Sequence, residues 1–538
     1  MLHELRKQGT RLVTIRSGEE AMNEAEWNGR RGDITRRTFV GGVLLATSGL
    51  AARAQTEAPT PRRGGILKVS CYLNPSKLDP YTGNSAVDQT VMWPMFDTLV
   101  EFDQTMKPRP GLAKWHYPDP KTLVFDIFPD ITFHDGTPCD AQAVKWNLER
   151  AMNFTRSVVK ADLVNVASIE VTGPLTVVLH LKAPDKTIPL MLSDRPGMMS
   201  SPKAVEAAGD DYDRKPCGTG QFKFVSWADG DRVILARNEN YRKKGQPYLD
   251  GITFRIMTDY AAGARAVAAG ENDFMFLVPP RLYNNLKQNS DLTVYKYPSM
   301  RIMNLFFNYG RGAVKDVRVR RAINYAIDRV GFTKVTTDGT GDVACSLIPP
   351  QHWAYDAESA NTFPYDPDKA KALLAEAGFG GGLTLDMMVL PDAEYRKRAD
   401  IIMDNLSKAG ITINLMPNQQ ATSTFINQQK GDMYLVSWPG RPELTQTYFQ
   451  IFSKDSYYNV AHETPIANIE ELINATRLSE DPAERKAAFA ALTRAERNFP
   501  LFAPICAEQV VYVARNKVKG FQPSFMGKPK FDGMFLAA

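Results

Sequence analysis

The chain has 538 residues, more than one hydrophobic core usually organises, so we expect two or three lobes. Hydrophobic residues make up 43% and charged residues 23%, as in ordinary soluble globular proteins, and the formal net charge is only +5. The charges are spread without long basic runs, which argues against nucleic acid or an anionic membrane surface as a partner.

The first segment with a clear pattern resembles an export signal. Residues 35–50 hold a twin-arginine pair followed by an apolar run, and residues 52–54 supply the small side chains that a signal peptidase recognises. The apolar run is shorter than the ~20 residues that span a bilayer, so residues 1–55 are expected to be a cleaved twin-arginine (Tat) signal. The mature protein is then soluble and periplasmic. A membrane anchor or a buried helix is the alternative, and the true start is Met1 or Met22.

The middle of the chain is typical of strands joined by tight turns. Residues 123–128 and 175–181 are predicted strands, and a helix is predicted to begin at Asp140 between them. Residues 221–227 and 232–237 are rich in β-forming residues and flank an Asp-Gly pair, which predicts a β-hairpin.

The second half of the chain changes to helical spacing. A helix capped by Asp316 is predicted to carry one apolar stripe, formed by Val319, Ile323, Ala326, Ile327 and Val330. Another helix is predicted over 366–378, between an Asp-Pro start and a glycine stop.

A strand, a helix and a second strand follow that helix. The strands are predicted at 383–389 and 411–415, and the helix between them ends at Gly410. This is a βαβ unit, which implies parallel strands joined by a right-handed crossover. Asp481 is predicted to begin a last long helix.

Patterns of catalytic and metal sites are largely missing. The sequence has no HExxH, GxSxG or Walker pattern, and its five cysteines form no CxxC pair. The Gly218-Thr-Gly220 stretch leads into a strand, which favours a tight turn over a phosphate-binding loop. His134 and Asp135 precede a glycine in a turn-forming stretch, which favours a structural turn over a catalytic pair. We therefore expect no catalytic residue, no metal site and no cofactor.

Short blocks along most of the chain resemble one protein family. Each block is weak alone, but their order over residues 64–515 is specific. The blocks are Leu78-Asp-Pro80, Leu112-Ala-Lys-Trp115, 133–138 (FHDGTP), 218–222 (GTGQF), 237–241 (RNENY), 269–273 (AGEND), 307–308 (FN), 316–328 (DVRVRRAINYAID), 365–367 (YDP) and 370–378 (AKALLAEAG). With these blocks the chain resembles the extracytoplasmic solute-binding proteins of ABC importers, in the peptide/nickel-binding group (family 5).

The resemblance implies an α/β fold of the periplasmic-binding-protein type (type II), with two α/β lobes, a hinge and an inserted extra domain. The implied divisions are 64–90, 211–300 and 504–538 for a discontinuous lobe one, 91–210 for the inserted domain and 301–503 for lobe two. It also implies a monomer that closes on a small-molecule or peptide ligand and then docks on an ABC permease and ATPase complex at the inner membrane.

The same resemblance places Trp438 in the ligand cavity, with a core position at a strand end as the alternative. Just beyond this Trp, many peptide-binding relatives carry an Asp that pairs with the ligand's ammonium group. Here the sequence is Gly-Arg-Pro-Glu over 440–443, so Arg441 reverses the charge. Its guanidinium suits a carboxylate or phosphate, and the hypothesis is a ligand that is neutral or anionic at that end. A solvated surface Arg is the alternative.

Weaker ligand candidates lie at strand-to-loop edges near the expected hinge, and a structural role is the alternative for each. They are Tyr72, Asn84 and Ser85 after the first strand, Arg301 and Met303 at the crossing into lobe two, and Tyr448 after Trp438.

The sequence thus predicts a non-catalytic binding protein, and two other function classes stay open. An exported sensor would bind a ligand but feed a receptor instead of a permease. A hydrolase on the same scaffold would need a nucleophile and a base that converge in the cleft.

Overall fold

The computed structural model describes residues 60–537, apart from 84, 361–362 and 455. The predicted export signal and the candidate Asn84 lie outside the described residues.

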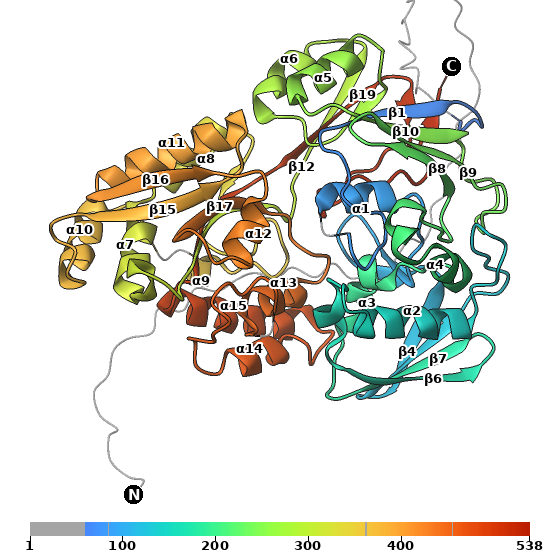
Figure 1. Ribbon diagram of the computed structural model, residues 1–538, viewed down its shortest axis with the longest axis horizontal. Coiled ribbons are helices and arrows are strands. Elements are labelled where there is room, and N and C mark those ends of the chain that lie inside the picture. Colours follow the sequence, from blue (N-terminus) through green and yellow to red (C-terminus); the bar gives the residue numbers. More distant parts are fainter. Residues whose placement is uncertain (1–59, 84, 361–362, 455, 538) are drawn as a thin grey trace, which may run out of the picture. The chain divides into compact units, whose positions relative to one another are not determined.

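The largest sheet has seven strands and gathers them from distant parts of the chain (Figure 1). Its central strand β1 pairs in parallel with β10 and β11, and β8 and β9 form the predicted hairpin. In spatial order the strands are β12 (Leu292–Tyr297), β19 (Val510–Arg515), β11 (Phe274–Met275), β1 (Ile66–Cys71), β10 (Gly251–Ile256), β9 (Arg232–Arg237) and β8 (Phe222–Ala228). Helices α5 (Tyr260–Ala268) and α6 (Tyr283–Lys287) accompany this sheet.

A second sheet has six strands, and it contains the predicted βαβ unit. The parallel strands β15 (Leu383–Val389) and β16 (Ile411–Pro417) are joined by α11 (Ala393–Ser407), as expected. The remaining strands are β14 (Asp342–Val343), β18 (Phe502–Ala507), β13 (Ile302–Phe307) and β17 (Met433–Trp438), and the accompanying helices are α7 (Val317–Ala326), α8 (Arg329–Thr336) and α10 (Pro367–Glu376).

A third, antiparallel sheet of four strands has a hydrophobic core of its own. Asp140 caps helix α2 by accepting a hydrogen bond from the Ala143 amide at 3.0 Å, so the predicted helix start is confirmed. The elements are β4 (Ala113–Asp119), β5 (Thr122–Ile127), β7 (Thr176–Leu181), β6 (Val166–Gly173) and α2 (Ala141–Asn153).

A group of helices completes the C-terminal half. Asp481 caps α15 as predicted, accepting from the amides of Ala483 and Glu484. The helices of this group are α13 (Leu444–Phe452), α14 (Ile469–Ala475) and α15 (Pro482–Asn498). The remaining elements are α1 (Ala86–Met92), α3 (Ile188–Met191), α4 (Pro202–Ala208), α9 (Ala357–Ala360) and α12 (Ala421–Ile426), with the strand pairs β2 (Val100–Phe102) with β3 (Pro108–Pro110) and β20 (Val518–Lys519) with β21 (Phe535–Leu536).

The helix predicted from Asp316 is shorter than its apolar stripe suggested. It ends at Ala326, Ile327 is extended, and Asp328 caps a new helix by accepting from the Gly331 amide at 2.9 Å. Val330 therefore turns outward and is 68% exposed, so its predicted place in the stripe is wrong. The helix is interrupted at this second cap, because the Asp328 side chain accepts a hydrogen bond from a backbone amide that would bond to a backbone carbonyl in a continuing helix.

Two chain segments run between the seven-stranded and six-stranded sheets. One connects β12 to β13, and the other connects β18 to β19 through Glu508 and Gln509. The Glu508 amide donates to the Arg301 carbonyl at 2.9 Å, and Ser299 Oγ donates to the Glu508 carbonyl at 2.6 Å. The crossings are thus bonded to each other, as expected of a two-segment hinge.

Within the described part of the chain, no helix combines the length and the apolar character needed to cross a membrane. All five cysteines are unpaired; Cys71, Cys139 and Cys506 are buried, and Cys217 and Cys345 are partly buried.

Candidate functional site

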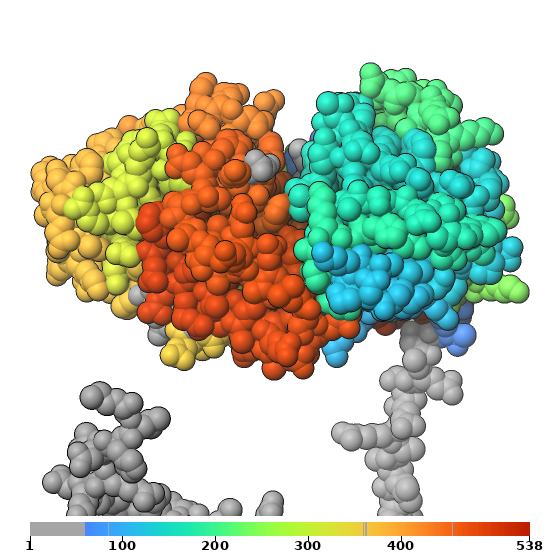
Figure 2. Space-filling model, turned by 90° about the horizontal axis from the view of Figure 1, so that it is seen from below, coloured from blue at the N-terminus to red at the C-terminus, as the bar shows by residue number. Residues whose placement is uncertain are grey.

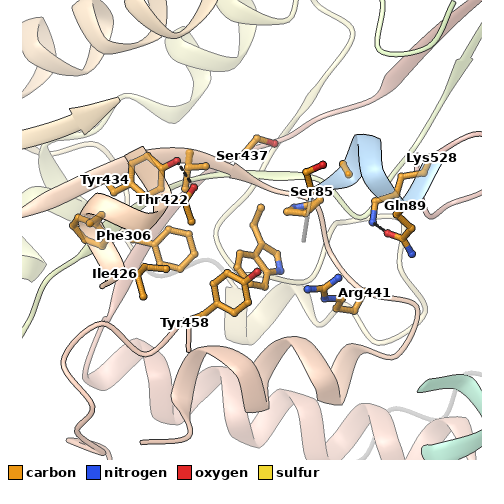
Figure 3. A pocket seen from close by; sticks show the side chains of 15 residues that line it. Ser85, Gln89, Phe306, Thr422, Ile426, Tyr434, Ser437, Arg441, Tyr458 and Lys528 are labelled. Carbon is orange, nitrogen blue, oxygen red and sulfur yellow. Dashed lines mark hydrogen bonds between the residues drawn. The ribbon is translucent and has the colours of Figure 1, made fainter. Parts of the chain in front are cut away.

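A cavity of about 170 Å³ lies between helix α1, which follows strand β1 of the seven-stranded sheet, and strands β13 and β17 of the six-stranded sheet (Figure 3). One wall comes from α1 and the C-terminal segment. The opposite wall comes from β13, α12, β17 and the loop after β17. The lining residues are Ser85, Ala86, Gln89 and Lys528 on the first wall, and Phe306, Thr422, Phe425, Ile426, Tyr434, Val436, Ser437, Trp438, Pro439, Arg441 and Tyr458 on the second.

One end of this cavity is apolar and aromatic. In β17, Tyr434, Val436 and Trp438 share the cavity face because alternate residues of a strand point to the same side. Met433 and Leu435 point the other way, into the core beneath the sheet.

Helix α12 and strand β13 complete this apolar end. Thr422, Phe425 and Ile426 have the spacing of one helical face, and the ring of Phe306 lies 5.9 Å from that of Trp438. The Tyr434 hydroxyl bonds to Thr422 Oγ1 at 2.9 Å. This end therefore offers apolar surface with few free polar groups.

The opposite end of the cavity is charged and buried. Arg441 Nη1 lies 3.8 Å from Asp194 Oδ2, and Arg441 Nε donates to Gln450 Oε1 at 3.2 Å. Gln450 in turn donates to Asp162 Oδ1 at 3.1 Å. Lys528 Nζ donates to Gln89 Oε1, and Gln89 Nε2 donates to Asp194.

This end holds more positive than negative charge. Arg195, Arg441 and Lys528 stand against Asp162 and Asp194, and each of these five residues is at most 5% exposed. An uncompensated buried charge costs several kcal/mol, so the group must gain a counter-ion or lose its own charge. These five residues carry up to three positive charges against two negative ones, so one buried cation has no anion to balance it.

Burial acts on the pKa of each of these groups, and the neighbouring charges oppose or reinforce it. Burial, reinforced by Arg441 and Arg195, lowers the pKa of Lys528 well below its usual range, although Asp194 opposes the shift. Burial raises the pKa of Asp162 in spite of Arg441. For Asp194, burial acts upward, but the charges of Lys528, Arg195 and Arg441 together hold its pKa below the usual value.

Trp438 presents an unused donor beside this charged end. Its side chain is 7% exposed and its Nε1 has no hydrogen-bond partner among the described residues. Buried donors are nearly always paired in native proteins, so this one fits a ligand acceptor.

A second cavity, of about 190 Å³, lies next to the hinge. Tyr72 lines it and stacks on Tyr260 with ring centroids 5.2 Å apart. Glu508 there joins two arginines, with Arg301 Nε at 3.3 Å and Arg398 Nη2 at 2.7 Å.

Ser437 connects the two cavities. It lines the first cavity, its hydroxyl donates to Glu508, and its amide donates to Tyr395 Oη at 3.1 Å in the second. Ser437 therefore links the ion pairs of the hinge to the wall of the first cavity.

Three of the candidate residues lie together in the first cavity, namely Ser85, Trp438 and Arg441. Arg441 is buried, so it is not the solvated surface residue of the alternative interpretation. Tyr72 and Arg301 lie apart from them, in the second cavity.

Met303 and Tyr448 line neither of these two cavities. Met303 is in β13 on the face opposite Phe306, where it packs into the core with Leu305. Tyr448 is in α13 and faces α15, where its hydroxyl bonds to Thr493 Oγ1 at 3.3 Å. The structure thus places neither Met303 nor Tyr448 at these cavities, because a position near the hinge or near Trp438 does not say which face of an element a side chain takes.

Sequence reasoning missed Gln89, Phe425, Tyr458 and above all Lys528. Strand β17 carries apolar or aromatic residues on both faces apart from Ser437, so its sequence does not mark the face that borders the cavity. No local signal points to Lys528, which reaches the cavity from the opposite end of the chain. As for metals, no group of three His, Cys, Asp or Glu side chains in the described residues is placed to hold an ion.

Known proteins of similar sequence show the family to which the chain belongs. The sequence model of the bacterial extracellular solute-binding proteins, family 5 (middle region), matches residues 107–459. The chain belongs to this family. The glutathione-binding protein GsiB of Salmonella paratyphi A is 33% identical over 349 residues, covering 64% of this chain and 67% of the relative. The GsiB protein of Escherichia coli K12 is 27% identical and covers 83% and 90%, respectively.

Solved structures share the fold. The DppA protein of Helicobacter pylori, in complex with the peptide STSA, aligns with a TM-score of 0.82 at 22% identity, covering 89% of this chain and 99% of that one. AgaA of A. tumefaciens R10, in complex with agropinic acid, aligns with a TM-score of 0.80 at 23% identity, covering 88% and 99%. The predicted family and the predicted type II binding-protein fold are confirmed. The chain is thus a bacterial extracellular solute-binding protein of family 5, and the DppA neighbour is described as an ABC transporter-associated periplasmic binding protein.

Proposed function

We propose that this binding protein captures a small organic anion with an apolar end in the first cavity. The two lobes close over the ligand without chemistry, and the closed monomer delivers it to the permease and ATPase of an ABC importer. We also propose that residues 1–55 direct export by the twin-arginine route.

The observation that carries the proposal is the missing anion at the charged end of the cavity, where Arg195, Arg441 and Lys528 face only Asp162 and Asp194. A ligand carboxylate there would balance the third buried cation and accept a charge-assisted hydrogen bond from the guanidinium. It would also supply the acceptor that Trp438 Nε1 lacks. A free ammonium group at the same place would instead add a further positive charge to this end.

The apolar wall and the volume of the cavity restrict the chemistry and the size of the rest of the ligand. The wall of Phe306, Phe425, Ile426 and Val436 favours an aliphatic or aromatic group. The volume of about 170 Å³ is below the roughly 300–1,000 Å³ of drug-sized sites, so the ligand is small. Glutathione, bound by the GsiB relatives according to their name, carries carboxylates and belongs among the compounds to test.

We propose that the three sheets mark the domains. The seven-stranded sheet forms lobe one, the four-stranded sheet forms the inserted domain and the six-stranded sheet forms lobe two. Because β18 pairs with β13, we move the last boundary from 503/504 to the crossing at Glu508 and Gln509. Closure would then rotate the lobes about the bonded crossings.

A thermal-shift screen of the purified protein tests this function. The panel holds organic acids, opines, peptides including glutathione, sugars and nickel chelates. A compound that binds only the folded state, present at a hundred times its dissociation constant, adds ~2.7 kcal/mol of stability. We expect organic acids to raise the melting temperature, Arg441→Gln to abolish the shift and Arg396→Gln, on the exposed side of α11, to preserve it. A shift with cationic or neutral compounds alone would contradict the proposed ligand class.

A further inference from the structure

Lys528 is held in the cavity by the course of the C-terminal segment. The preceding Gly527 has a φ of 71°, and a Cβ atom there would lie 2.7 Å from the Cβ of Ser299 in the first hinge crossing. Only glycine allows this close approach, which brings the next side chain to α1. Lys528 is buried there, and its Nζ bonds to a neutral acceptor, Gln89 Oε1, rather than to a carboxylate.

Charged groups from several elements face Lys528. Asp194 and Arg195 come from the turn after α3, Arg441 from the loop after β17 and Arg301 from the hinge. Figure 3 shows Lys528 with Gln89 and Arg441. The Asp194 carboxylate reaches Lys528 only through Gln89 and also lies near Arg441. Asp162 faces the far side of Arg441 through Gln450.

Among the three cations of this cavity end, only the lysine can readily give up its proton. Guanidinium groups stay protonated in proteins, so Arg195 and Arg441 keep their charges. Ammonium groups lose theirs when burial and like charges make the cation costly. The two acids balance the two arginines, which leaves Lys528 without an anion of its own.

We infer that Lys528 is a second anion-recognition residue, which is neutral in the empty cavity and takes up a proton when a carboxylate enters. This inference rests on the proposed function for the existence of an anionic ligand, but not for the state of the empty site.

The sign of the pH dependence follows. A carboxylate beside Lys528 stabilises the ammonium form and so raises its pKa above the value in the empty cavity. Between these two pKa values, binding takes up one proton, and carboxylate affinity falls as the pH rises through that window. A neutral analogue gives no such dependence.

Lysine NMR tests the empty state without knowledge of the natural ligand. In the full protein, labelled with ¹³C at lysine Cε, the signal lost in Lys528→Arg is assigned to Lys528 and followed with pH. We expect it to titrate well below the exposed lysines. Lys530→Met is the matched control, because that ammonium lies 3.9 Å from the centre of the Phe102 ring and not in the first cavity. It should leave the Lys528 signal unchanged.

Acetate is the probe for the bound state. Addition of acetate at 100 mM is expected to move the Lys528 titration upward, while acetamide leaves it in place. A Lys528 that titrates with the exposed lysines overturns the inference and leaves the proposed function standing. If Lys528 titrates at a low pH and acetate does not change that titration, the inferred link between proton uptake and carboxylate binding is wrong. Acetate binding that Lys528→Met leaves unweakened overturns the recognition role.

Discussion

The buried ion pair between Arg477 and Asp185 makes a quantitative prediction about how the structure is held together. Arg477 follows α14 and Asp185 follows β7, so the pair joins the C-terminal helices to the part of the chain that carries the four-stranded sheet. Figure 2 shows these two regions, orange-red and teal, against each other. Arg477 Nη1 lies 2.9 Å from Asp185 Oδ2, and the Lys186 amide donates to the Arg477 carbonyl at 2.8 Å.

The magnitude follows from burial. The side chains of Arg477 and Asp185 are 5% and 0% exposed, so removal of the guanidinium leaves a carboxylate with almost no access to water. Amide and hydroxyl donors from Thr187 and Asn165 soften this loss but do not neutralise the charge. Breaking such a pair costs about 3–5 kcal/mol, against about 0–1 kcal/mol for an exposed pair.

A double-mutant cycle in urea measures this cost. We expect Arg477→Met to lower the free energy of unfolding by about 3 kcal/mol or more, and Arg477→Met with Asp185→Asn to recover much of the loss. The exposed pair Arg396–Asp400 serves as the control, for which Arg396→Met should cost less than about 1 kcal/mol. The reasoning is refuted when Arg477→Met costs no more than the control.

Two further predictions concern the cavity and the buried acid Glu496 of α15. Trp438→Phe keeps an aromatic ring but removes the unpaired Nε1–H, so carboxylate affinity should fall about tenfold in calorimetry, with the urea midpoint nearly unchanged; equal affinity would mean that the ligand does not use this donor. Burial raises the pKa of Glu496 to about 8 despite Arg329 and Arg320, so the folded protein holds a proton there that the unfolded chain releases. The contribution of Glu496 to the free energy of unfolding is therefore fully present below the unfolded pKa of about 4.5 and is lost as the pH rises toward 8. Glu496→Gln should then stabilise the protein by up to about 3 kcal/mol at pH 7 and by little at pH 4. The same gain at both pH values in urea titrations would contradict this account.

Much of the fold follows from local chemistry. Asp140, Asp366 and Asp481 cap their helices as their sequence context indicates, because a cap is decided by residues within one turn. The strands and helix of the βαβ unit likewise carry their own periodicity. Val330 shows the limit, since a second local signal at Asp328 competed with a stripe that looked continuous.

The residues of the candidate site were harder to predict from the sequence than the elements of the fold. Trp438 and Arg441 could be named from the family resemblance, but the burial of Arg441 depends on α13 and on Asp162 and Asp194, which are distant in the chain. Met303 failed because both faces of β13 carry apolar residues, so alternation alone does not say which face borders the cavity. Lys528 could not be predicted, since tertiary packing alone brings it to Gln89.

The most direct test of the central claim is titration calorimetry of the unmodified protein with matched pairs of ligands. Each pair consists of a small carboxylate with an apolar end, such as 3-phenylpropionate, and its primary amide, which has nearly the same shape but no charge. The account predicts that the carboxylate member of a binding pair is at least tenfold tighter, about 1.4 kcal/mol, because it supplies the anion that the charged end of the cavity lacks. Equal affinity for acid and amide, or tighter binding of an amine of the same shape, would contradict it.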